Sequence, residues 1–336
     1  MENMPPLYGS PRDLYAKDLN YEDIILRHNK SIVSSRSECV IETFFGKKKY
    51  ASPVCCSNMK SILTQDICKI FDNRKWFYVY HRIDGCDDVF NFVERTKREG
   101  WYSTSISVGI DVEWINLLEK MSEMNYSIDA ITVDVAHSFN DNIIPIIAAI
   151  KKYYPESFLI VGNGSTADWI HFMESLDVDC VKMGIGVSKA CRTRQYTGFG
   201  SSTVSCLIEC YNAAKKVKIM TDGGLTVDKN GEVWVGDINK SLVLGSDYVM
   251  SGAAFSKCID SPAILNGYYG NASENAKGHK KHVEGTNVKV YTNGLTISEM
   301  CDLIEDSIRS GISYAGGKNL EAFRTVQYSL IEQWIQ

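Results

Sequence analysis

The chain has 336 residues, a formal net charge of −5, and 44% hydrophobic and 23% charged residues. This length can bury a sizeable core and suits either two average domains or one large α/β barrel. The acidic balance gives no support to general nucleic-acid binding, and no run of 18 apolar residues predicts a membrane span. Eleven cysteines without paired zinc spacing, and an N-terminus without an apolar signal region, predict free thiols in a reducing cytoplasm and no metal site.

Short apolar runs recur along the chain, and segments with helical periodicity separate most of them. The runs are 52–59, 76–83, 103–110, 130–137, 157–164, 180–186, 217–224 and 247–255, and clear helical segments are 112–124, 141–154, 166–176 and 202–216. Continuous β-branched runs that alternate with helices predict a parallel sheet buried on both faces. We therefore predict an α/β protein, a single (β/α)8 TIM barrel domain over 1–336. An open doubly wound sheet usually has fewer strands and a G-x-G-x-x-G turn after the first one.

Two later segments do not fit the strand-and-helix repeat. Residues 225–238 predict a small hairpin built on Asn230-Gly231, placed as an excursion at the barrel rim. Residues 256–295 are polar and rich in Gly, Lys and His, and so long an insert after the eighth strand predicts a mobile flap. The next residues, 296–315, predict a helix.

The stretch 181–200, VKMGIGVSKACRTRQYTGFG, carries the strongest chemical signal. An apolar run ends in Gly184-Ile185-Gly186, whose glycines let backbone N–H groups approach an anion closely. Cys191 follows, with Arg192 and Arg194 beside it, and cationic neighbours favour a thiolate. The stretch therefore predicts a nucleophilic cysteine beside a phosphate-bearing substrate.

Four segments in combination resemble the IMP dehydrogenase/GMP reductase family. They are NYEDIILRHNKSIVSSRSEC (20–39), the cysteine loop (181–200), IMTDGG (219–224) followed by DYVMSGAAF (247–255), and YYGNASENAKGHKKHVEGTNVKV (268–290). IMP dehydrogenases usually carry a regulatory insertion that this chain lacks, and the ending SGISYAGGKNLEAF looks more like the GMP reductase branch. The resemblance implies a (β/α)8 barrel, a homotetramer, and NADPH-dependent reductive deamination of GMP, or a related purine nucleotide monophosphate, to IMP and ammonia.

The resemblance also implies roles for individual residues. Cys191 would attack purine C2 and form a covalent adduct, while Thr193 and Glu284 would relay protons to the leaving amine. Asp134 and Arg82 complete the expected catalytic group. The residues expected to bind the substrate are Asn58, Ser188, Lys189, Asp222, Gly223, Gly224, Ser251, Gly252, Tyr269, Gly270, Asn271 and Ser273. Those expected to bind NADPH are Ser107, Asp134, Ala136, Lys280 and Lys281.

Several positions depart from the family pattern. Arg82 stands where the family has lysine, and arginine effectively cannot release a proton. The family loop reads Gly-Pro-Gly-Ser-x-Cys, whereas residues 186–191 read GVSKAC, so either Ser188 or Lys189 would have to hold the phosphate. Asn271 replaces a methionine that usually lies near the base.

Three alternatives stay open. An IMP dehydrogenase-like oxidation of IMP with NAD uses the same cysteine, so the loop alone does not separate the two reactions. A diverged, non-catalytic barrel that binds a purine nucleotide is the second, and the retained catalytic and ribose-binding groups argue against it. The same chemistry on a deoxy or modified purine nucleotide is the third. The altered residues that motivate the second alternative are Arg82, Lys189, Asn271 and Val283.

Overall fold

The computed structural model describes residues 18–188, 190–227, 232–278 and 284–331. Its centre is a parallel sheet of seven strands in the order β4-β10-β9-β8-β7-β6-β5. The strands are β4 (Val54–Cys56), β5 (Ser105–Val108), β6 (Ala130–Asp134), β7 (Phe158–Gly164), β8 (Cys180–Met183), β9 (Lys218–Asp222) and β10 (Tyr248–Ser251). The predicted α/β class with a parallel sheet is confirmed.

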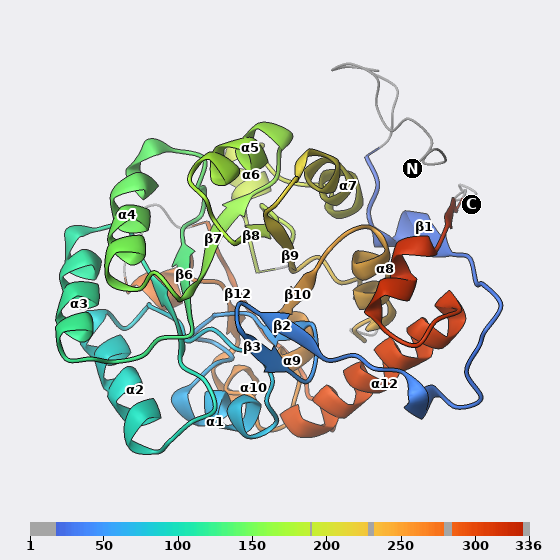
Figure 1. Ribbon diagram of the computed structural model, residues 1–336, viewed down its shortest axis with the longest axis horizontal. Helices are drawn as coiled ribbons and strands as arrows, with labels where there is room; N and C mark the ends of the chain where they lie inside the picture. The colour runs from blue at the N-terminus through green and yellow to red at the C-terminus, as the bar shows by residue number, and fades with distance from the viewer. Residues whose placement is uncertain (1–17, 189, 228–231, 279–283, 332–336) are drawn as a thin grey trace.

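Helices follow most of these strands and lie around the outside of the sheet (Figure 1). They are α1 (Gln65–Asn73), α2 (Cys86–Arg98), α3 (Val112–Glu123), α4 (Ile144–Tyr153), α5 (Ala167–Ser175), α6 (Thr193–Thr197), α7 (Thr203–Ala213) and α8 (Gly236–Val243). In α3, Trp114, Leu117, Leu118 and Met121 are buried, the spacing of one helical face. Helices α3, α4, α5 and α7 fall within the four segments that periodicity predicted as helical.

The expected strand at 76–83 is where the structure differs from the prediction. Within the described residues, this segment joins the sheet only through a parallel bridge between Tyr80 and Ile106. Its side chains still alternate between an inner and an outer apolar cluster, with Phe77 and Val79 inside and Trp76, Tyr78 and Tyr80 outside. Apolar patterning reports which side chains are buried, whereas a strand also needs a hydrogen-bonded neighbour along its length.

A hairpin of β2 (Thr43–Phe45) and β3 (Lys48–Tyr50) fills the amino-terminal end of the sheet. Phe45 is 2% exposed, and its ring stacks at 4.0 Å from Phe77 and at 4.0 Å from Tyr248, the first residue of β10. The inner cluster around Phe45 also contains Tyr50, Cys55, Val79, Ala130, Phe158, Ile160, Cys180, Met220 and Met250. Because packed side chains occupy this end, functional groups are left to the carboxyl-terminal ends of the strands.

The chain after β10 passes through several short elements. They are α9 (Ala253–Ser256), α10 (Ala263–Asn266), β11 (Tyr268–Tyr269), α11 (Glu274–Lys277) and β12 (Asn287–Val288), and β11 pairs antiparallel with β12. In the expected hairpin at 225–238, Val227 and Val233 form an antiparallel bridge. The turn predicted at Asn230-Gly231 lies outside the described residues.

The two ends of the described chain lie side by side (Figure 1). Strand β1 (Ile24–Leu26) pairs antiparallel with β13 (Tyr328–Leu330), and the long helix α12 (Ile297–Ala315) packs nearby against α8. Short 3-10 helices are η1 (Tyr21–Asp23), η2 (Arg36–Glu38), η3 (Asp141–Ile143) and η4 (Leu320–Thr325). None of the helices in the described part of the chain combines the length and hydropathy needed to cross a bilayer.

Candidate active site

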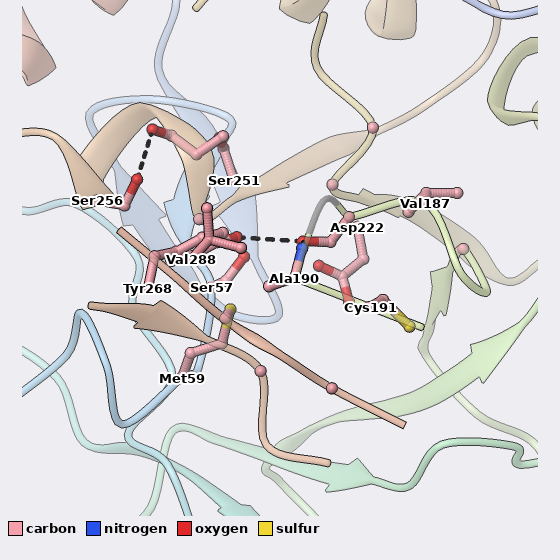
Figure 2. Close-up of a pocket in the computed structure, with 18 of the residues that line it drawn as sticks. Ser57, Met59, Val187, Ala190, Cys191, Asp222, Ser251, Ser256, Tyr268 and Val288 are labelled. Atoms are coloured by element: carbon pink, nitrogen blue, oxygen red, sulfur yellow. Dashed lines mark hydrogen bonds between the residues drawn. The ribbon is translucent and has the colours of Figure 1, made fainter. Parts of the chain in front are cut away.

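A cavity of about 560 Å³ lies at the carboxyl-terminal ends of the strands, a size typical of small-molecule sites. Figure 2 shows Cys191 and Asp222 near each other on one side of the view, with Ser57, Ser251 and Tyr268 on the other. The predicted site residues that line this one cavity are Asn58, Arg82, Asp134, Ala136, Ser188, Cys191, Thr193, Asp222, Gly223, Gly224, Ser251, Gly252, Gly270, Asn271 and Glu284. Residues expected from different parts of the chain therefore meet in one place.

Three predicted site residues that the structure describes do not line the cavity, namely Ser107, Tyr269 and Ser273. Ser107 is buried within β5, where its hydroxyl donates to the Tyr80 carbonyl at 2.8 Å. Tyr269 is buried and accepts a hydrogen bond at its carbonyl from Ser61, and Ser273 caps α11 instead of facing the cavity. Lys189, Lys280 and Lys281 lie outside the described residues.

The Cys191 thiol is the first member of a chain of polar contacts. Its Sγ lies 3.1 Å from Thr193 Oγ1, and Thr193 donates its hydroxyl hydrogen to Glu284 Oε2 at 2.6 Å. Because that hydrogen is already directed to the carboxylate, the threonine oxygen can accept a hydrogen bond from the thiol. Thiol, hydroxyl and carboxylate thus form a path along which a proton can move.

Backbone pairing brings Glu284 to the cysteine loop. Gly285 forms β-bridges with both Cys191 and Ser273. The Arg192 N–H also donates to the Glu284 carbonyl at 2.6 Å. A Cβ atom on Gly285 would lie 2.8 Å from the Ser273 nitrogen, so this close crossing requires glycine. The crossing holds the carboxylate against the loop that carries the thiol.

The two arginines of the loop have other partners. Arg192 Nη1 donates to the Tyr196 hydroxyl at 3.4 Å. The Arg194 side chain lies along Gly200, where an added Cβ atom would come within 2.5 Å of Arg194 Nε. Neither contact joins a guanidinium to the sulfur, so stabilisation of a Cys191 thiolate by these arginines stays a prediction.

The floor of the cavity holds a buried lysine that sequence reasoning missed. Lys182 Nζ lies 2.5 Å from Asn163 Oδ1, 2.7 Å from Asp222 Oδ2 and 3.2 Å from Asp134 Oδ1. Burial by itself would raise the pKa of Asp134, but Lys182 and Arg82 outweigh burial, so the pKa of Asp134 is lowered. A single lysine inside the apolar run CVKM was the sequence signal that could have revealed this cluster.

Another part of the cavity is lined by glycines and hydroxyl groups. Gly223 and Gly224 have φ angles of +81° and +80°, a backbone region that other residues rarely adopt. The Tyr268 hydroxyl, which sequence reasoning also missed, lies 3.4 Å from Ser188 Oγ. Burial raises the pKa of Tyr268 to about 12, so its hydroxyl stays protonated and can donate to an anion.

One group of possible metal ligands lies at the start of α2. Ligand atoms of His81, Asp84 and Asp88 lie within 4.8 Å of one another. The Lys60 ammonium bonds Asp84, and the Tyr80 hydroxyl donates to Asp88 at 2.7 Å. Each of the two carboxylates therefore has a protein partner within the described residues.

Comparison with known proteins gives one consistent result. Residues 18–333 match the family model described as IMP dehydrogenase / GMP reductase domain. GMP reductase of Helicobacter pylori is 36% identical over 329 residues, covering 95% of this chain and 97% of that protein. GMP reductase of Staphylococcus aureus is also 36% identical over 329 residues, with 95% and 98% covered. The chain belongs to the IMP dehydrogenase/GMP reductase family.

Proposed function

We propose that this protein is an NADPH-dependent oxidoreductase that converts GMP, or a closely related purine nucleotide, to IMP and ammonia. The observation that carries the proposal is the contact path from the Cys191 thiol through Thr193 to Glu284, on the rim of a cavity that Asp222 also lines. The full-length similarity to two GMP reductases supports this direction of the reaction over the oxidation of IMP.

The residues of the chain would act on the nucleotide in sequence. The Cys191 sulfur would bond to purine C2 as its proton passes to Thr193 and Glu284. The C2–N2 bond would then break, and the amine would leave as ammonia after taking a proton from the same path, since an unprotonated amine is a poor leaving group. When bound, NADPH would supply the hydride that C2 needs. The C2–S bond would then break with Cys191 leaving as a thiolate, which would regain a proton from water through Glu284 and Thr193.

Two observations support the placement of a nicotinamide group in this cavity. Arg82, Asp134 and Ala136 line the same cavity as Cys191. Asn271 donates through Nδ2 to the Asn58 carbonyl and to Asp134, and these two acceptors fix its amide so that Oδ1, which is buried and has no partner among the described residues, is the free acceptor. A carboxamide N–H is a donor of the type this oxygen lacks. The preference for NADPH rests on Lys280 and Lys281 and stays a prediction.

A pair of assays tests the function. Protein incubated with GMP and NADPH should consume the reduced cofactor, measured by its absorbance, and release ammonia. Incubation with IMP and NAD should produce little reduced cofactor. The opposite pattern would identify an IMP dehydrogenase. Nucleotide binding without turnover in either assay would identify a purine-nucleotide-binding protein, and a panel that includes deoxy and modified nucleotides ranks the substrates through ligand-induced thermal stabilisation.

We extend the proposal to the architecture. The inner cluster joins side chains of β4 and of 76–80 at the two ends of the sheet, which supports closure into a (β/α)8 barrel with 225–238 and 256–295 as excursions at its rim. The family also suggests a cytoplasmic homotetramer whose partners are purine nucleotides rather than nucleic acid or membranes. Light scattering on the purified protein tests the tetramer.

A further inference from the structure

Lys182 is a charged side chain in the interior of the sheet. It is 3% exposed and lies in β8 between Val181 and Met183, which are both fully buried. A buried ammonium is costly unless it is paired and hydrogen-bonded. Its three partners come from three other strands, Asp134 at the end of β6, Asn163 in β7 and Asp222 at the end of β9.

The neighbouring strand is adapted to this lysine. Gly162 of β7 faces Lys182 across the sheet, and a Cβ atom there would lie 2.5 Å from Lys182 Cβ and 2.8 Å from its carbonyl oxygen. Real Cβ atoms do not approach so closely, so any other residue would displace one strand or the lysine. The glycine is therefore part of the arrangement that holds the ammonium.

Lys182 and its neighbour Asn163 both donate to the same carboxylate oxygen of Asp222. Oδ2 accepts from Lys182 at 2.7 Å and from Asn163 Nδ2 at 2.9 Å. A carboxylate oxygen with two donors is well occupied, which orients the group and leaves Oδ1 to receive hydroxyl groups of a ligand. Asp134 is held in a similar way, with Oδ1 at Lys182 and Oδ2 accepting from Asn271 at 3.2 Å.

We propose that Lys182 is a positioning residue that holds Asp222 and Asp134 as one unit. The roles of the two carboxylates in this proposal rest on the proposed function. Through this unit, recognition of the sugar hydroxyls at Asp222 and chemistry beside Asp134 are coupled. Two carboxylates facing one pocket would otherwise repel each other, and one of them would take up a proton.

Lys182 is the cation that contacts both carboxylates, and the other titratable groups around the unit do not replace it. Burial lowers the pKa of the Lys182 ammonium, but Asp222 and Asp134 more than offset this, so its pKa is raised and it stays charged. Arg82 adds positive charge near Asp134. Burial raises the pKa of Cys55, from β4, and of Tyr268, from β11, so both remain neutral at physiological pH.

The first test needs no ligand. Lys182→Gln keeps N–H donors but removes the charge, and Lys182→Arg keeps the charge. The unfolding free energy of each protein is measured by denaturant titration from pH 7 to pH 4. The Gln variant should be less stable than the wild type at pH 7, and the gap should shrink on acidification, because its carboxylates gain protons at a higher pH. The Arg variant and the exposed control Lys120→Gln should keep a constant difference from the wild type. A gap for Lys182→Gln that is independent of pH would overturn the proposal.

The second test uses GMP as the probe. Calorimetry on wild type, Asp222→Asn, Lys182→Gln and the double variant gives a double-mutant cycle. Each single change should weaken GMP binding by about tenfold or more, as for loss of a charged hydrogen bond, and the double variant should be hardly weaker than either. Losses that multiply would contradict coupling through Lys182. In an active enzyme, the acid limb of the kcat/KM pH profile should move up by about 1 pH unit or more in Lys182→Gln and return in Lys182→Arg.

These readouts separate the two proposals. An absence of GMP turnover in the wild type ends the proposed reaction, while the pH dependence of stability still decides the role of Lys182. If Lys182→Gln does not fold, the Lys182→Arg variant tests the role of Lys182. The proposal expects the stability of Lys182→Arg to depend on pH as that of the wild type does. A pH dependence in Lys182→Arg that differs from the wild type would then overturn the role.

Discussion

Thr193 donates its hydroxyl hydrogen to Glu284 across 2.6 Å, although the two residues are 91 positions apart in the chain. The contact joins the first residue of α6 to the polar segment that follows β10. It places a carboxylate two hydrogen-bonding steps from the Cys191 sulfur.

Replacing that carboxylate should slow the chemical step. In Glu284→Gln the side chain keeps its size but cannot hold a proton in transit, so we expect kcat to fall by about 10²- to 10⁴-fold with little change in GMP affinity. Steady-state kinetics and calorimetry measure the two quantities. The matched control is Glu274→Gln, an exposed carboxylate in the first turn of α11, which should leave kcat unchanged. Near-normal turnover of Glu284→Gln would remove this residue from the proton path.

Removal of the thiol should separate binding from turnover. Cys191→Ala lacks the nucleophile, and we expect kcat to drop by about 10⁴-fold or more while GMP still binds. Cys206→Ala on α7 is the control, because that thiol does not line the cavity and should be dispensable. Mass spectrometry of the wild type quenched during turnover should detect the nucleotide adduct. A Cys191→Ala protein with normal turnover would show that the mechanism is wrong.

The inner cluster around Phe45, at the amino-terminal end of the sheet, should contribute to the unfolding free energy. Phe45→Ala removes a ring that stacks on Phe77 and Tyr248, so we expect the unfolding free energy to fall by about 3–5 kcal/mol. Phe44 is the preceding residue of the same strand and is 56% exposed, so Phe44→Ala should cost about 0.5 kcal/mol or less. Denaturant titration of both variants compares them directly. Equal losses of unfolding free energy in the two variants would mean that packing of Phe45 in the inner cluster adds nothing to stability.

Glu174 gives a stability effect with a defined pH dependence. Its Oε1 accepts the backbone N–H groups of Lys215, Lys216 and Val217. Burial raises the pKa of Glu174, but these donors outweigh burial and the pKa is lowered. The stabilisation is therefore present above the unfolded pKa of about 4.3 and is lost as pH falls through the lower folded value. We expect Glu174→Gln to cost about 2 kcal/mol at pH 7 and much less near pH 3, measured by denaturant unfolding. A cost that stays constant between these pH values would contradict the assignment.

Sequence patterns predicted the repeating parts of the fold better than its connections. The buried face of α3 is visible in its periodicity, because helix burial depends on local spacing. The segment 76–83 has the burial pattern of a strand, yet its pairing depends on where distant strands lie, which local spacing does not record.

The candidate site was predictable where a motif carried it. The placement of Cys191, Thr193 and Glu284 in one cavity follows the family resemblance and not any local spacing, since Glu284 reaches the loop through backbone bridges of Gly285. Ser107 was expected to bind the cofactor, but its hydroxyl donates to the Tyr80 carbonyl inside the sheet. Lys182 was missed because an apolar run usually signals core alone, and its partners lie on strands that are adjacent only after folding.

The pairing of β1 with β13 also has a consequence for synthesis. Strand β1 is synthesised before the seven-stranded sheet and β13 after it, so Ile24 to Leu26 have no β13 partner while the sheet is being made. During that interval the unpaired edge is open to association with other nascent chains. A truncation that removes Tyr328 to Leu330 would make this exposure permanent, and the product should be recovered mainly as aggregate.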